Sequence, residues 1–163
     1  MQKRILRYLI FCLTAVVAAC GGDKVVHNNQ NHNDGHHHHH EPPHGGVPVV
    51  LGNEEFHLEL LIDNSSSKMM MYILDAHMEN FIRISSNEIA MKVSSDGTER
   101  ELKFMAQSSN STGETVGDTS FFAAEDDVIK ELTEFEVVIP EISIKGSTYT
   151  NVAFPFPEGN EPH

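Results

Sequence analysis

Phe56-His57-Leu58-Glu59-Leu60 alternates strictly between apolar and polar side chains. This period of two is typical of a β-strand with one face turned to a core, here the face of Phe56, Leu58 and Leu60. His57 and Glu59 share the opposite face, about 7 Å apart along the strand. The stretch therefore predicts a β domain and places two groups that can ligate metal on the same side of one strand.

Short runs of the same kind, separated by turn residues, follow and precede this strand. We expect strands over residues 47–51, 56–60, 69–74, 81–84, 88–93, 101–106, 135–139, 142–145 and 148–154, with a further short one opening at Phe121-Phe122. Pro140 separates two of them because proline cannot donate to a β ladder. A short helix is expected over 126–134. Strand number and spacing predict an all-β fold, an antiparallel β-sandwich that is immunoglobulin-like in outline with at most one short helix; a partly open barrel is the alternative.

The first twenty residues have the pattern of an export signal. Lys3, Arg4 and Arg7 precede an apolar run over 8–19 that ends in Val17-Ala18-Ala19-Cys20. The run is shorter than the roughly 20 residues that span a bilayer. A cysteine after Val-Ala-Ala resembles a bacterial lipobox, in which the thiol is acylated and the preceding peptide is removed. An ordinary secretory signal or a short membrane anchor is the alternative.

The lipobox resemblance implies an order of segments and a location. We expect a lipoprotein signal peptide over 1–19, a lipid-anchored, disordered His-rich spacer over 20–46, a β-sandwich domain over 47–157 and a tail over 158–163. Gly21 stands where an inner-membrane retention signal would usually have Asp. By similarity to sorted lipoproteins, this favours the outer membrane of a bacterial envelope, facing the periplasm or the cell surface.

Cysteine content and charge exclude several classes of function. Cys12 and Cys20 are the only cysteines, so a mature chain acylated at Cys20 would have no free thiol and no disulfide, and its hydrophobic core must hold it. That chain has eight basic and 24 acidic residues, a net charge of −16 with neutral histidines. Such a balance argues against nucleic acid as a partner. No G-x-S-x-G, Walker or H-E-x-x-H motif occurs, so we do not expect an enzyme.

The spacer carries the strongest chemical signal, a tract of eight histidines. They are His27, His32, His36, His37, His38, His39, His40 and His44. The consecutive run has five members and belongs to a wider Asn/His/Gly tract, which favours a native segment over an engineered tag. Neutral imidazoles bind zinc, copper and nickel, so the tract predicts several exchangeable metal sites. The alternative is a hydrophilic spacer whose histidines only confer solubility.

A second candidate metal site combines His57 and His77 with nearby carboxylates. Asp75, His77 and Glu79 follow each other at a spacing of two, as His57 and Glu59 do. If the strands bring both histidines together, two imidazoles and a carboxylate could hold zinc or copper. The alternative is that each histidine is simply solvated.

Several short segments resemble a group of small, uncharacterised bacterial lipoproteins. They are His44-Gly45-Gly46, Leu51-Gly52, Glu55-Phe56-His57-Leu58-Glu59, Tyr72-Ile73-Leu74-Asp75 and His77. Such proteins combine a lipobox, a His-rich spacer and one compact β domain. The resemblance covers roughly His44 to Asn160; it implies an exported β domain, suggests a metal-handling role, and supplies no catalytic residue.

Two functional hypotheses follow from these patterns. The first is a lipid-anchored envelope protein that binds zinc, copper or nickel ions without a required cofactor, for buffering or for delivery to an envelope transporter. The alternative is a non-metal envelope module that binds another protein, by an exposed edge strand for example, with the His tract as a spacer.

Overall fold

The computed structural model describes residues 41–161. The expected signal peptide, Cys20 and the histidines from His27 to His40 lie outside these residues, so the predictions for them stay predictions. The part of the chain from 41 to 161 contains no helix with the length and hydrophobicity that crossing a bilayer requires.

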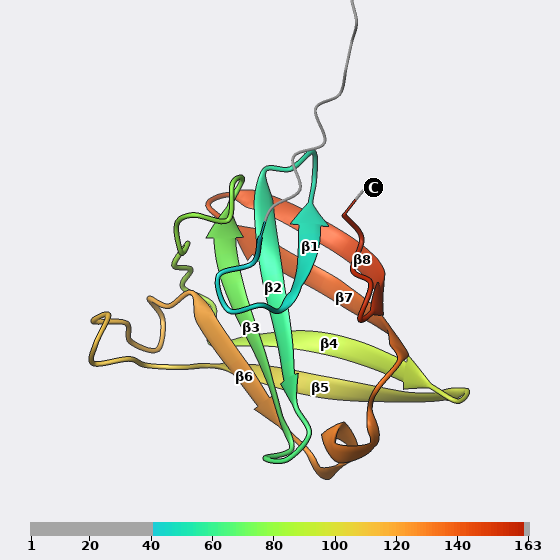
Figure 1. Ribbon diagram of the computed structural model, residues 1–163. Helices are drawn as coiled ribbons and strands as arrows, with labels where there is room; N and C mark the ends of the chain where they lie inside the picture. The colour runs from blue at the N-terminus through green and yellow to red at the C-terminus, as the bar shows by residue number, and fades with distance from the viewer. Residues whose placement is uncertain (1–40, 162–163) are drawn as a thin grey trace, which may run out of the picture. The chain divides into compact units, whose positions relative to one another are not determined.

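Eight antiparallel strands form one sheet (Figure 1). They are β1 (Val47–Leu51), β2 (Phe56–Asp63), β3 (Lys68–Asp75), β4 (Glu88–Ser95), β5 (Thr98–Ala106), β6 (Phe121–Glu125), β7 (Phe135–Ile144) and β8 (Ser147–Phe156). Their order in the sheet is β1-β2-β3-β6-β5-β4-β7-β8, so β6 lies between β3 and β5. Consecutive strands otherwise pair mainly as hairpins, which suits the short turns of the sequence.

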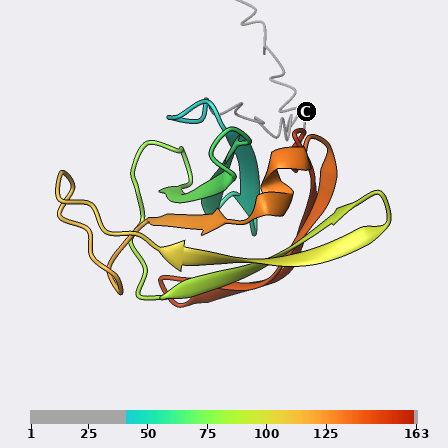
Figure 2. The same cartoon turned by 90° about the horizontal axis from the view of Figure 1, so that it is seen from below.

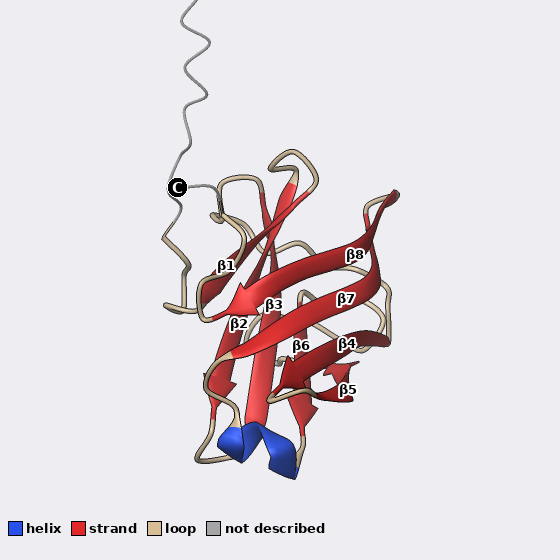
Figure 3. Cartoon of the chain, turned by 90° about the vertical axis from the view of Figure 1, so that its right-hand side faces the viewer, coloured by secondary structure: helices blue, strands red, loops and turns tan. Residues whose placement is uncertain are grey.

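The sheet coils until its two end strands approach each other. Seen along a second direction, β7 and β8 cross the strands of the first half, and the body is nearly barrel-shaped (Figure 3). The residues after β8 complete the closure, because Asn160 Oδ1 accepts a hydrogen bond from Val50 N at 2.7 Å and Asn160 Nδ2 donates to Val50 O at 3.2 Å. One edge residue of β1 is thereby paired by a side chain, which protects part of an open edge.

One hydrophobic core fills the interior of the coiled sheet. Alternate residues of the strands point inward, and the largest fully buried side chains include Leu58, Met71, Met91, Phe104, Phe122 and Phe154. Burial of this kind contributes roughly 25 cal/mol per Å² of apolar surface. In a domain with no cysteine between residues 41 and 161, this core is the main source of stability.

The structure confirms the all-β, antiparallel prediction and refines it in four places. The strands form a single sheet rather than the two sheets of a sandwich, as the alternative of a partly open barrel predicts. The expected break at Pro140 is wrong, because β7 continues through this residue. Within β7, only Glu136–Val138 pair with β4, so Pro140 does not need to donate a hydrogen bond to β4. Residues 81–84 make isolated bridges and no strand, and the expected helix is the short 3-10 helix η1 (Asp127–Glu131), capped by Asp126.

Substitution of Gly159 tests the closure between β8 and β1. Gly159 has φ +76°, and a Cβ there would overlap the Pro48 carbonyl oxygen of β1. We expect Gly159→Ala to lower the free energy of unfolding by about 3 kcal/mol, since backbone strain and overpacking add. The matched control is Gly97→Ala, where φ is +75° and nothing lies within 4 Å of the added carbon; it should cost only about 1 kcal/mol. Equal losses in urea unfolding would contradict the proposed role of the closure.

Candidate functional site

The outer face of β2, β3 and β6 carries a row of side chains set by strand register. Glu59 pairs with Tyr72, and Tyr72 pairs with Phe121. Residues directly opposite each other on neighbouring antiparallel strands have Cβ atoms about 5 Å apart. The row therefore joins a carboxylate and two rings that are distant in sequence.

Glu59 holds the segment before β1 against this face. Its carboxylate is fully buried, and Oε1 accepts hydrogen bonds from His44 N at 2.7 Å and Gly46 N at 3.0 Å. The His44 Nδ1 lies 2.7 Å from Glu59 Oε2. A buried carboxylate is costly unless its oxygens accept hydrogen bonds, and these three contacts satisfy both of them.

The two glycines after His44 make this contact possible. Gly45 has φ +72°, a conformation that favours glycine, and its N–H donates to Pro42 O at 3.0 Å in a turn. A Cβ on Gly46 would lie 2.8 Å from both Glu59 Cγ and Leu60 O. The sequence His44-Gly45-Gly46 is therefore the pattern needed to bring an imidazole onto a buried carboxylate of β2.

Four rings form an aromatic cluster on this face, and two of them, Tyr72 and Phe121, belong to the row just described. His44 stacks on Tyr72 with ring centroids 4.1 Å apart, and Tyr72 stacks on Phe121 at 4.6 Å. Phe81, from the connection after β3, is tilted against His44 at 5.6 Å and Tyr72 at 5.9 Å. Phe81 is 46% exposed, so the cluster presents ring surface to solvent.

The aromatic cluster forms one wall of a pocket of about 360 Å³. The opposite wall comes from loop 108–118, which projects beyond β5 and β6 (Figure 2). Ser108, Ser109 and Thr112 line this side of the pocket. The pocket thus has an aromatic side and a hydroxyl-bearing side, a combination common in sites for small ligands.

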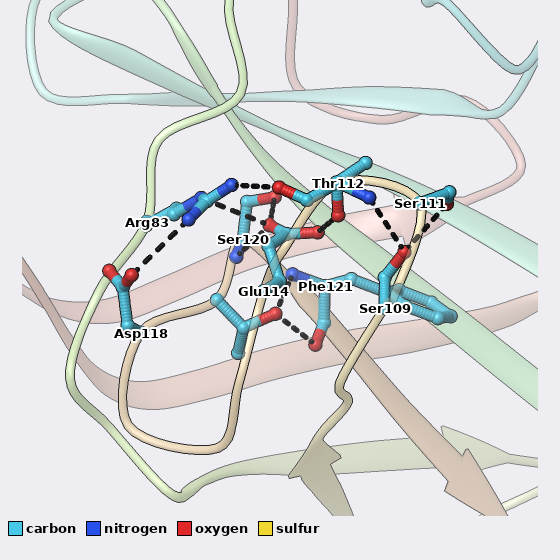
Figure 4. Close-up of polar contacts among 9 residues, drawn as sticks. Arg83, Ser109, Ser111, Thr112, Glu114, Asp118, Ser120 and Phe121 are labelled. Carbon is cyan, nitrogen blue, oxygen red and sulfur yellow. Dashed lines mark hydrogen bonds and ion pairs between the residues drawn. The ribbon is translucent and has the colours of Figure 1, made fainter.

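Hydrogen bonds to the buried side chain of Glu114 hold loop 108–118 together (Figure 4). Its carboxylate is buried and accepts hydrogen bonds from the backbone and hydroxyl of Ser120 and from Thr112 Oγ1. Arg83 Nε lies 3.8 Å from Glu114, and the same guanidinium contacts the Thr112 carbonyl at 2.6 Å and Asp118 at 3.2 Å. Burial alone would raise the pKa of Glu114, but these hydrogen bonds and the Arg83 charge hold it below its usual 4.5.

The two buried carboxylates also set the electrostatics of the pocket. Burial raises the pKa of the Tyr72 phenol, and the negative charges of Glu59 and Glu114 raise it further. The electrostatic potential at the Tyr72 phenol is therefore negative and opposes any further negative charge. An anionic ligand is disfavoured in this pocket.

The structure places the two histidines of the second sequence-predicted metal site in different environments. His57 is fully buried, with Nδ1 3.3 Å from Asp75 O, whereas His77 is exposed in the turn after β3. The Asp75 carboxylate accepts hydrogen bonds from the backbone of that turn, including Glu79 N at 2.9 Å. Residues 41–161 contain no group of three or more His, Cys, Asp or Glu arranged to hold a metal. The expectation that His57 and Glu59 lie on one face holds, but that face is covered and neither side chain is solvated.

Sequence reasoning missed most of the pocket. His44 was predicted as a metal ligand, and Tyr72 lies in a segment of the lipoprotein resemblance. Phe81, Arg83 and Phe121 were expected only as strand residues, and neither they nor Glu114 carried a signal for a site. No protein-family model matches the chain, and neither does any curated protein or solved structure with which it was compared. The likeness to small lipoproteins stays a prediction.

Replacement of Glu59 tests the buried contact with His44. Glu59→Gln puts a donor where one carboxylate oxygen accepted, so a buried hydrogen bond is lost. We expect a loss of about 1–3 kcal/mol in the free energy of unfolding, and displacement of the His44 ring resonances in NMR spectra. Glu101→Gln, on the exposed face of β5, is the matched control and should change neither. Unchanged His44 resonances in Glu59→Gln would contradict the assigned contact.

The lowered pKa of Glu114 predicts how stability depends on pH. Because the folded-state pKa lies below the usual 4.5, the carboxylate stabilises the protein fully above that value, and the contribution is lost as the pH falls through the folded pKa. Glu114→Gln should therefore reduce stability at pH 7 and reduce the further loss between pH 5 and pH 3. Urea unfolding of both proteins across this interval measures the difference. Parallel pH profiles would contradict the argument.

Proposed function

We propose that the chain is a lipid-anchored protein of a bacterial envelope, acylated at Cys20, whose His-rich segment binds zinc, copper or nickel ions. The eight imidazoles between residues 27 and 44 support this proposal by composition. The proposed role is buffering of the ion, or its delivery to an envelope transporter.

The single observation that carries the proposal is the contact of His44 with Glu59. Histidines that ligate metals usually donate their second ring nitrogen to a carboxylate or a carbonyl, which fixes the tautomer and orients the ring. The His44 Nδ1 has this partner in Glu59 Oε2, and the side chain is 37% exposed. Its Nε2 is then the nitrogen available to an ion.

His44 is the one member of the tract within the described residues, and it follows His40 by four positions. An ion on His44 Nε2 would take its further ligands from residues 27–40 rather than from the β domain, since residues 41–161 hold no group of three ligating side chains. Ligand sets chosen from many imidazoles exchange readily. That property suits a buffer or a carrier more than a permanent metal site.

Metal titration of the mature chain, freed of metal by chelation, tests the proposal. We expect Zn²⁺, Cu²⁺ or Ni²⁺ to bind with dissociation constants well below 1 mM, and deletion of residues 27–40 to remove most of this binding. In the intact chain, His44→Gln should weaken the tightest site by about tenfold. Binding should also weaken below about pH 6.5, the usual range of imidazole titration, because protons compete with the metal.

His77→Gln is the matched control, since His77 is exposed on the same domain but lies outside the tract. It should leave the affinity unchanged. Binding that survives both the deletion and His44→Gln would refute the tract as the metal site. Binding no tighter than millimolar in the intact chain would favour a non-metal envelope module, whose binding surface would then be on the β domain.

A further inference from the structure

We propose that the pocket between the aromatic cluster and loop 108–118 binds a neutral pyranose sugar. This inference does not depend on metal binding. It rests on the shape of the pocket, on the different chemistry of its two walls and on the charges behind them.

The size of the pocket suits a small ligand. Its volume of about 360 Å³ lies at the lower end of the roughly 300–1,000 Å³ of small-molecule sites. The nearby exposed surface includes Phe81, which is 46% exposed although it packs against two other rings. Because Phe81 itself lines the pocket, part of its ring surface is open to a ligand there.

The aromatic wall offers one open platform. Tyr72 is stacked on both sides, by His44 and by Phe121, so it presents its edge to the pocket. The Phe81 ring is inclined by 44° to that of His44 and by 58° to that of Tyr72, and it has exposed surface. A pyranose has one face made largely of C–H groups, and these can pack on an aromatic ring through dispersion and the quadrupole of the ring.

The loop side of the pocket carries hydroxyl groups and one carboxylate, that of Glu114. Ser108 and Ser109 line it with hydroxyls that can donate and accept hydrogen bonds, as the hydroxyls of a sugar do. Thr112 also lines it, and its Oγ1 can accept, since its proton is donated to Glu114. The charge of Glu114 is balanced within the protein, because Arg83 Nε lies 3.8 Å from its carboxylate, whose oxygens also accept hydrogen bonds from Ser120 and Thr112. The wall therefore matches a neutral ligand better than a cation.

The carboxylates of Glu59 and Glu114 disfavour a ligand that carries negative charge. Glu59 and Glu114 both act on the Tyr72 phenol, and the whole chain has a net charge of −13. Phosphorylated or carboxylated ligands would be repelled. A neutral polyol with one apolar face fits the aromatic platform, the hydroxyl groups and the negative potential together.

The hydroxyl wall is also held in place before any ligand arrives. Ser109 and Glu114 pair through two backbone hydrogen bonds of 3.0 Å, and Arg83 contacts the Thr112 carbonyl. The loop is thus fixed both along its own backbone and from the connection after β3. Such preorganisation lowers the ordering cost of binding a small ligand.

Calorimetric titration of the full mature chain in detergent, with chelator present, tests the proposal. The probes are glucose, galactose and N-acetylglucosamine. We expect at least one to saturate with a dissociation constant of about 1 mM or tighter. Aromatic NMR resonances of Phe81, Tyr72 and Phe121 should shift with the same constant. Phe81→Ala should weaken binding by about tenfold, because the platform is removed.

Met105→Ala is the matched control, since Met105 is 47% exposed and does not line the pocket; it should leave sugar affinity unchanged. Ser109→Ala provides a second variant on the opposite wall and should also weaken binding. Failure of all three sugars to saturate would overturn the proposal. So would saturation only by tetramethylammonium or N-acetylphenylalaninamide, which would indicate a cation or a peptide side chain. Equal affinities for Phe81→Ala and Met105→Ala would likewise place the ligand elsewhere.

Discussion

The buried carboxylate of Glu59 is the constraint on which the functional face depends. A carboxylate on a strand of an antiparallel sheet would ordinarily face water, and burying it is unfavourable unless donors surround it. Here the donors come from His44 and Gly46, so the segment before β1 must lie across β2. That position stacks His44 on Tyr72 and supplies one end of the aromatic cluster. One charged group thereby links the His-rich segment to the pocket.

The strand pattern of the fold was predictable because it is local. The alternation in 56–60 identified β2 and its faces correctly, and the apolar run 69–74 identified β3. Alternation cannot say what covers each face. His57 and Glu59 are fully buried, and the segment before β1 lies over Glu59, to which it donates hydrogen bonds. Pro140 misled for a related reason, since its effect depends on how far β4 extends beside it.

The candidate site was predictable only where one residue carried its own signal. His44 belonged to a visible tract, and the glycines after it have a conformational reason to be there. Tyr72 and Phe121 meet only because β6 pairs with β3, although two strands intervene in sequence. Glu114, Ser120 and Arg83 form a network whose members come from two connections. Nothing in a single sequence fixes such non-local pairing, and no periodicity records it.

His44 belongs to both the proposed metal site and the wall of the pocket, and this sharing has a physical consequence. Its ring stacks on Tyr72 while Nδ1 contacts Glu59 Oε2, so the same ring orientation serves both contacts. A metal ion on Nε2 reinforces that orientation, since ligation at one ring nitrogen favours a proton on the other. An ion would therefore hold the His44 ring more rigidly in the aromatic cluster rather than displace it. By linkage, a ligand that needs the stacked cluster would in turn favour the ring orientation that binds the ion.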